Sequence, residues 1–277
     1  MNQPAVSIRP NRARRRLRAG LPVVSASLAA NSTGDRETLE LFAAQGLTDV
    51  VWVEMEHGGT DWGELGDIAR ACDLWGVTSL IRVMRNDSAE IGRALDRGMQ
   101  SVLVPHVTTR EQAERIVNAS LYAPEGERGA AFPRQSYGVP DYLATANEEV
   151  LIVALLEDIE AFENLDDILQ VDRIDCFFIG PVDLAQTMGA EYLGQPFHPD
   201  VQTVVRDGIV RIVAAGSCAG TLVNDENVAE FLSAGVRFLR LAALSYMEDG
   251  LKEFHRRVAD TSERAAALSG PPVVDRI

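Results

Sequence analysis

The chain of 277 residues has little lysine and cysteine and no long apolar run. Of its 26 basic residues only Lys252 is a lysine, so a mechanism that uses a lysine Schiff base has one candidate. Cys72, Cys176 and Cys218 are far apart and lie in apolar surroundings, which predicts reduced thiols and a cytoplasmic protein. No window offers the roughly 18 uninterrupted apolar residues that a membrane-spanning helix needs. The sequence therefore predicts no membrane partner.

Basic charge is scarce outside the N-terminal segment. The net charge is −15, yet residues 9–18 contain six arginines and no acid. An acidic body repels phosphate backbones, which predicts no nucleic-acid partner. The arginine-rich segment and residues 21–30 have two interpretations: a helix that leads into a first strand, or a secretory or twin-arginine signal. Pro22, Ser25 and Ser27 interrupt the apolar stretch and favour the helix.

Short apolar runs alternate with amphipathic segments along the whole chain, a pattern typical of parallel strands joined by helical crossovers. The predicted strands are residues 23–28, 49–55, 78–83, 101–105, 150–156, 176–180, 220–223 and 238–242. The predicted helices are residues 36–45, 63–75, 88–97, 110–119, 161–170, 201–215 and 226–234. Eight such units predict an α/β protein with a (β/α)8 TIM barrel. A doubly wound open sheet is the alternative, but no glycine-rich dinucleotide motif follows any strand.

The domain organisation follows from the same pattern. Residues 1–20 are predicted to form a basic arm or helix, residues 21–268 the barrel, and residues 269–277 a tail. No change of composition divides the barrel, so it is predicted to be a single domain. The last helix is predicted to run from Met247 through Leu268. Lys252 lies on this helix, beyond the eighth strand, and its side chain cannot easily reach the barrel mouth.

Polar residues fall at the predicted C-terminal ends of several strands, where the active sites of TIM barrels lie. They are Glu54, Glu56 and His57 after the second strand, Arg82 at the end of the third, His106 after the fourth, Glu157 and Asp158 after the fifth, and Asp183 after the sixth. Glu157 and Asp183 come from adjacent strands, and paired carboxylates suit a hard cation such as Mg²⁺ or Mn²⁺. The alternative is that each is a loop-capping or solvated acid.

His57 and Arg82 also have two interpretations each. An imidazole titrates near neutral pH, so His57 in its Gly-flanked loop suits a general base, or else its ring is satisfied by backbone groups. Arg82 at the end of an apolar strand can bind a carboxylate or enolate oxygen through its planar guanidinium. Alternatively, it forms a structural ion pair with Glu54 or Glu56.

Several motifs in order resemble the HpcH/HpaI aldolases, which are metal-dependent class II pyruvate aldolases on a TIM barrel within the phosphoenolpyruvate/pyruvate superfamily. The motifs are Glu54-Met55-Glu56-His57-Gly58, Ile81-Arg82-Val83 with Asn86-Asp87, Ala94-Leu95-Asp96-Arg97-Gly98, Val102-Leu103-Val104-Pro105, Tyr122-Ala123-Pro124-Glu125-Gly126-Glu127-Arg128-Gly129 and Phe178-Ile179-Gly180-Pro181-Val182-Asp183-Leu184. The resemblance covers roughly residues 11–251.

The resemblance implies a role for each matching residue. His57 matches the catalytic histidine, Asp96 the aspartate that pairs with it, and Arg82 the arginine that contacts the keto oxygen of pyruvate. Glu157 and Asp183 match the two ligands of a divalent metal, Mg²⁺, Mn²⁺ or Co²⁺. The residues implied to face the substrate carboxylate are Gly129, Ala131, Gly180, Pro181 and Val182.

The implied activity is cleavage or formation of 4-hydroxy-2-keto acids, with pyruvate or a related 2-keto acid and an aldehyde as partners. Relatives form dimers to hexamers by exchanging the last helix, which implies a homo-oligomer. Oxaloacetate decarboxylation, citramalyl-type lysis and a weakened non-catalytic paralogue remain alternatives. The sequence departs from the family pattern at Leu155, which replaces a glutamine, at Ala130-Ala131 and at Ala242-Ala243-Leu244. These departures leave the substrate open.

Overall fold

The computed structural model of the chain describes residues 7–27 and 36–261, with side chains up to residue 258. Eight parallel strands form one sheet in the order β1-β8-β7-β6-β5-β4-β3-β2. The strands are β1 (Val23–Ser27), β2 (Val50–Glu54), β3 (Thr78–Arg82), β4 (Ser101–Val104), β5 (Leu151–Leu156), β6 (Cys176–Ile179), β7 (Ala219–Leu222) and β8 (Val236–Ala242). The two ends of this order, β1 and β2, also meet: the backbone N–H of Asp49, directly before β2, donates to the carbonyl oxygen of Val24 in β1 at 2.8 Å. The sheet therefore forms a nearly closed barrel.

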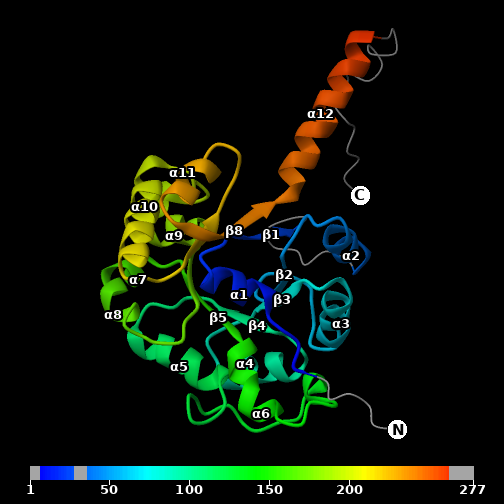
Figure 1. Ribbon diagram of the computed structural model, residues 1–277. Helices are drawn as coiled ribbons and strands as arrows, with labels where there is room; N and C mark the ends of the chain where they lie inside the picture. The colour runs from blue at the N-terminus through cyan, green and yellow to red at the C-terminus, as the bar shows by residue number, and fades with distance from the viewer. Residues whose placement is uncertain (1–6, 28–35, 262–277) are drawn as a thin grey trace, which may run out of the picture.

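Helices surround the strands (Figure 1). They are α1 (Arg12–Arg18), α2 (Arg36–Ala44), α3 (Leu65–Trp75), α4 (Ser88–Asp96), α5 (Arg110–Ser120), α6 (Tyr142–Thr145), α7 (Ile159–Glu163), α8 (Leu165–Ile168), α9 (Pro181–Met188), α10 (Pro199–Ala214), α11 (Val228–Ser233) and α12 (Ala243–Thr261). The predicted (β/α)8 TIM barrel is confirmed. Among the described residues, no helix is both long and apolar enough to cross a membrane.

Local sequence explains where the helices begin. Asp87 caps α4 by accepting hydrogen bonds from the backbone N–H groups of Ala89 and Glu90. Thr109 and Gln112 form a capping box at the start of α5, in which each side chain satisfies a backbone N–H of the other residue. Caps of this kind typically contribute about 1 kcal/mol each. They fix the ends of two helices that follow strands of the barrel.

The strands are buried on both faces, which explains why the sequence shows apolar runs instead of alternation. Every residue of β2, β3 and β5 is buried. Inside the barrel, Trp52, Phe178 and Phe238 pack edge to face with ring centroids 5.3 to 6.4 Å apart. Gly220 is needed beside them, because a Cβ at this position would lie 2.6 Å from the Phe178 ring. This aromatic cluster fills the barrel below its C-terminal end.

Helix α1 closes the opposite, N-terminal end of the barrel. Ala13 and Leu17 belong to the same buried cluster as the inward-facing strand residues. Arg14 is 2% exposed, and its Nε lies 2.9 Å from the carboxylate of Asp175, which directly precedes β6. The arginine-rich segment is thus a helix that leads into β1, which is the interpretation that Pro22, Ser25 and Ser27 favoured.

Two helices differ from their predicted form. Residues 161–170, predicted as one helix, form α7 and α8, which are separated at Asn164. The side-chain amide of Asn164 donates to the carbonyl oxygen of Thr108 at 2.9 Å, and the residue leaves helical geometry. Helix α9 starts at Pro181, directly after the predicted sixth strand, in a segment for which no helix was predicted. Its proline occupies the first turn, where its missing N–H costs nothing.

Helix α12 extends away from the barrel (Figure 1). Lys252 lies on it, is exposed, and pairs with Glu248 and Asp249 of the same helix. The single lysine thus lies on the last helix, beyond the eighth strand, as predicted. The three cysteines are free thiols, as predicted.

Candidate active site

A cavity of about 200 Å³ opens at the C-terminal end of the strands. Its walls are Trp52, Glu54, His57, Arg82, Leu155, Glu157, Phe178, Gly180, Pro181, Val182, Asp183, Leu222 and Arg240. Seven of the predicted site residues line it: His57, Arg82, Glu157, Gly180, Pro181, Val182 and Asp183. The structure therefore brings most of the predicted site together in one place.

Glu54, the last residue of β2, organises the neighbouring loop and Arg82. One carboxylate oxygen accepts hydrogen bonds from the backbone N–H groups of Glu56 at 2.8 Å and His57 at 3.1 Å. The other oxygen accepts from Nε of Arg82 at 2.7 Å. Arg82 also lies 3.0 Å from the carboxylate of Glu56. The ion pairs considered for Arg82 are both formed, and they hold its guanidinium in the cavity wall.

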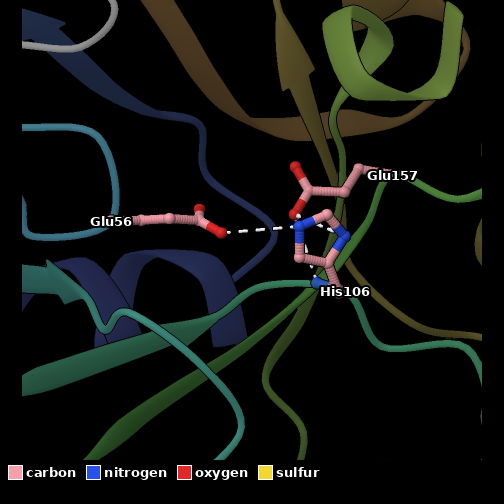
Figure 2. Close-up of side chains that lie close together, drawn as sticks. All are labelled: Glu56, His106 and Glu157. Atoms are coloured by element: carbon pink, nitrogen blue, oxygen red, sulfur yellow. Dashed lines mark hydrogen bonds and ion pairs between the residues drawn. The ribbon is translucent and has the colours of Figure 1, made fainter. Parts of the chain in front are cut away.

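Glu56, His106 and Glu157 place one possible ligand atom each within 4.8 Å of one another. Figure 2 shows the carboxylates of both glutamates directed at the His106 ring. The Nε2 atom of the ring lies 3.4 Å from the Glu56 carboxylate, and the Nδ1 atom lies 3.8 Å from the Glu157 carboxylate. His106 has a left-handed backbone, with φ of 54°, and its N–H donates to Glu157 at 3.1 Å. A strained backbone in a residue other than glycine often marks a functional site.

Together, burial, hydrogen bonds and the neighbouring charges raise the pKa values of Glu157 and His106 and lower the pKa of Glu56. The pKa of Glu157 is raised to about 8, mainly by burial and also by the negative charges of Asp183 and Glu56, while the positive charges of His106 and Arg82 oppose this shift. The pKa of His106 is raised to about 10, mainly by its hydrogen bond with Glu56 and also by Asp158 and Glu157, against the opposing effect of burial. Burial opposes ionisation of Glu56, but His106 and Arg82 outweigh it and lower its pKa. The acids are therefore crowded around the cations His106 and Arg82.

Such a cluster fits a divalent cation. Glu157 is 1% exposed, and a buried carboxylate beside other acids is stabilised when a cation binds. Gly180 keeps the space beside it open, because a Cβ there would lie 3.0 Å from the Glu157 carboxylate. Oxygen ligands with one imidazole suit a metal such as Mn²⁺. Asp183 lines the same cavity as Glu157, and its charge acts on Glu157, so the two predicted ligands lie near each other.

His57 and Asp96 lie apart in the described structure. His57 is half-exposed, and its Nε2 is 3.8 Å from Glu56. Asp96, at the end of α4, accepts a hydrogen bond from Arg128 at 2.7 Å. Within the described part of the chain, no hydrogen bond or ion pair joins the two residues, and their pairing stays a prediction.

The loop around Arg128 also lies outside the main cavity. Gly129 lines a separate hollow beside α4 and α5, together with Arg128. Ala131 accepts a long hydrogen bond of 3.5 Å from the Tyr122 hydroxyl through its carbonyl oxygen. Their predicted contact with the substrate carboxylate remains a prediction.

Several residues of the site were not predicted to bind a metal or take part in catalysis. Glu56 and His106 were visible at strand ends, but nothing in the sequence shows that they meet at Glu157. Trp52 lies in an apolar strand, and nothing in the sequence distinguishes it from a core residue. Arg240 carries a signal that could have identified it: it is a charged residue inside the apolar run of β8 and shares the inward phase of Phe238.

Comparison with known proteins agrees with this geometry. The family model HpcH/HpaI aldolase/citrate lyase matches residues 34–245. A 4-hydroxy-2-oxovalerate aldolase of Novosphingobium aromaticivorans is 38% identical over 229 residues, which are 79% of this chain and 86% of the relative. A hydroxypyruvate/pyruvate aldolase of Pseudomonas aeruginosa is 37% identical over 265 residues, covering 94% and 97% of the two chains.

A solved structure shows the same fold. The crystal structure of an HpcH/HpaI aldolase/citrate lyase family protein from Burkholderia cenocepacia J2315 has a TM-score of 0.80 and 26% identity, and the match covers 90% of this chain and 99% of that one. The barrel, the residues gathered at its C-terminal end and the family match over most of the chain agree with one another. On this evidence the chain belongs to the HpcH/HpaI aldolase/citrate lyase family.

Proposed function

We propose that the protein is a divalent-metal-dependent class II aldolase, a carbon–carbon lyase. It cleaves 4-hydroxy-2-keto acids to pyruvate, or a related 2-keto acid, and an aldehyde, and it forms them from the same two compounds. The observation that carries this proposal is the convergence of Arg82, His57, Glu157 and Asp183 on one cavity at the C-terminal end of the barrel. The names of the two aldolase relatives support the same reaction class.

Glu157 and Asp183 are the proposed metal ligands, and Glu56 and His106 lie close enough to Glu157 to contribute. When bound, Mg²⁺, Mn²⁺ or Co²⁺ supplies Lewis-acid stabilisation of the keto acid as it becomes an enolate. His106 can act as a ligand only through a ring nitrogen that carries no proton.

Arg82 is the proposed partner of the developing enolate oxygen. Arg82 is 6% exposed and its guanidinium is fixed by Glu54 and Glu56, so little reorganisation is needed when negative charge develops. The substrate carboxylate is proposed to lie against Gly180, Pro181 and Val182, where the first turn of α9 offers backbone N–H groups.

His57 is the proposed general base. It takes the proton of the 4-hydroxyl group during cleavage and returns it to the aldehyde oxygen during synthesis. Its ring borders the cavity and is half-exposed, so a substrate can reach it. Asp96 is proposed to assist His57 in an arrangement in which its carboxylate leaves Arg128.

The decisive experiment measures pyruvate released from 4-hydroxy-2-keto acids of several lengths, in EDTA and after addition of Mg²⁺, Mn²⁺ or Co²⁺. We expect release that EDTA abolishes and metal restores. His57→Ala should lose at least roughly 100-fold in kcat, the usual contribution of a general base, while still binding pyruvate. Activity that survives complete metal removal would overturn the proposed mechanism. Turnover of His57→Ala near the wild-type rate would remove His57 as the base.

The setting of the enzyme is also a proposal. The free thiols and the small-molecule reactants are consistent with a cytoplasmic enzyme. Helix α12 exposes apolar side chains along one stripe, Leu244, Met247, Leu251 and Phe254. A stripe of this kind supports a homo-oligomer, from dimer to hexamer, in which α12 packs against another copy.

A further inference from the structure

An imidazole distinguishes the cluster at Glu157 from a site made only of carboxylates. Nε2 of His106 lies 3.4 Å from the Glu56 carboxylate. Nδ1 of the same ring lies 2.9 Å from the carboxylate of Asp158. Glu56, His106 and Glu157 each place one ligand atom within 4.8 Å of the others, with both glutamates directed at the ring (Figure 2). The proposed function needs Glu157 and Asp183, and it does not depend on this imidazole.

The backbone holds His106 beside Glu157. Its φ of 54° is left-handed, a conformation that a residue other than glycine keeps only where the surroundings impose it. Its N–H donates to Glu157 at 3.1 Å. The next residue, Val107, is fully buried, and its N–H donates to the carbonyl oxygen of Leu155 at 3.1 Å. The imidazole is therefore anchored to β5 through the main chain on both sides.

The distances in the cluster suit ligands of one cation. Two ligand atoms that each lie about 2.0–2.2 Å from an ion, at an angle of about 90–110°, are about 3.0–3.5 Å apart. The 3.4 Å between Nε2 and Glu56 falls in this range, and it exceeds the about 2.7–2.9 Å that is usual for a charge-assisted hydrogen bond. Glu157 is 1% exposed, and Nη1 of Arg82 lies 3.9 Å from its carboxylate, beyond hydrogen-bond distance. A shared cation would bring a full positive charge to this buried carboxylate.

Asp158 occupies the place of the group that orients a metal-binding histidine. Such a histidine commonly donates its second ring N–H to a carboxylate, which fixes its tautomer and its orientation. Asp158 stands at the N-cap of α7, where an aspartate usually accepts a backbone N–H, but its side chain makes no capping hydrogen bond. It contacts Nδ1 of His106 instead, so Nε2 is the nitrogen that faces Glu56.

We propose that Nε2 of His106 is a ligand of the catalytic metal, with Asp158 as its positioning residue, and that this nitrogen makes the site select Co²⁺ over Mg²⁺. This inference rests on the proposed metal-dependent function. Mg²⁺ takes oxygen ligands and keeps several waters, whereas imidazole binds the later first-row ions more tightly. A site of carboxylates and water alone lacks this discrimination by nitrogen.

Pulsed electron paramagnetic resonance of the protein with bound Mn²⁺ tests the bond, because a directly bound nitrogen modulates the electron spin echo. We expect this nitrogen signal in the wild type and its loss in His106→Asn. Asparagine tolerates the left-handed backbone at this position, so the variant removes the ring without adding strain. His57→Asn is the matched control: it removes the histidine that lines the cavity and should keep the signal.

Isothermal titration calorimetry with Co²⁺ and with Mg²⁺ measures the selectivity. His106→Asn should lose at least roughly 100-fold in affinity for Co²⁺ and much less for Mg²⁺, since only Co²⁺ gains from the imidazole. Asp158→Asn should lose roughly 10- to 100-fold for Co²⁺ and still show the nitrogen signal, which separates a positioning residue from a ligand. Thermal unfolding in EDTA shows whether each variant is folded.

The wild-type spectrum decides the question even if His106→Asn does not fold. Bound Mn²⁺ without a nitrogen signal would overturn the inference and leave the proposed function standing, with Glu157 and Asp183 as the ligands. A signal that survives in a folded His106→Asn would assign the nitrogen to another residue, and equal losses for Co²⁺ and Mg²⁺ would remove the selectivity. A wild type that binds neither Mn²⁺, Co²⁺ nor Mg²⁺ would instead contradict the proposed function.

Discussion

At the C-terminal end of the barrel, the surroundings of each buried carboxylate determine whether its negative charge is already neutralised by protein groups. Glu54 is fully buried and satisfied by two backbone N–H groups and by Arg82, so it serves as an anchor and not as a metal ligand. Glu157 is also buried, but its ionisation is opposed by burial and by neighbouring acids. Two glutamates at equivalent strand ends therefore have different roles, which are set by their surroundings.

The first prediction concerns the metal ligands. Glu157→Gln and Asp183→Asn should each weaken Mn²⁺ binding by at least roughly 100-fold, because loss of a direct ligand exceeds the 10- to 100-fold effect of changing an outer partner. Isothermal titration calorimetry measures the affinity, and thermal unfolding in EDTA shows that the variants are folded. Glu163→Gln, an exposed acid on α7, is the control and should bind normally. Wild-type affinity in either variant would exclude that residue as a ligand.

At the scale of elements, the apolar runs predicted the strands with small errors at their ends, because strands covered on both faces leave a strong signal. The division of α7 from α8 could not be predicted. It depends on a hydrogen bond from Asn164 to Thr108, which is distant in the sequence. For the same reason Glu56 and His106 could be seen at strand ends but not assigned to one cluster with Glu157. Arg240 could have been noticed as a charge within an apolar strand.

The second prediction concerns α1 and the floor of the barrel. Arg14→Met should destabilise the protein by about 3–5 kcal/mol, because it leaves the buried Asp175 without its main cation. Arg16→Met on the exposed side of the same helix should change stability by no more than about 0.5 kcal/mol. Urea unfolding monitored by circular dichroism measures both values. Equal stability of the two variants would show that the Arg14–Asp175 pair contributes little.

At the scale of the molecule, the composition acquires a structural meaning. Four of the six arginines of the N-terminal segment, Arg9, Arg14, Arg15 and Arg18, pair with acids, so most of its charge is not a free basic surface. The single lysine lies on α12, and we therefore propose that stabilisation of an enolate depends on Arg82 and on a metal held at Glu157. The charge distribution and the mechanism therefore constrain each other.

The last prediction concerns the association of whole molecules through α12. Its apolar residues Leu251 and Phe254 are 57% and 61% exposed in the described part of the chain, and we propose that contact with another molecule buries them. Light scattering after size exclusion should give a multiple of 30.2 kDa for the wild type. The double variant Leu251→Asp, Phe254→Asp should shift the mass toward that of one chain, because two charges in an apolar contact are costly.

Lys252→Glu changes the net charge by the same amount as the double variant, but it lies on the polar side of α12, where Lys252 pairs with Glu248 and Asp249. It should keep the wild-type mass, which would separate loss of apolar contact from a general increase in repulsion. If the wild type itself elutes as a single chain of 30.2 kDa, the proposed oligomer is wrong. In that case the exposed stripe of α12 would need another partner, and the cavity, which is built from one chain, would remain intact.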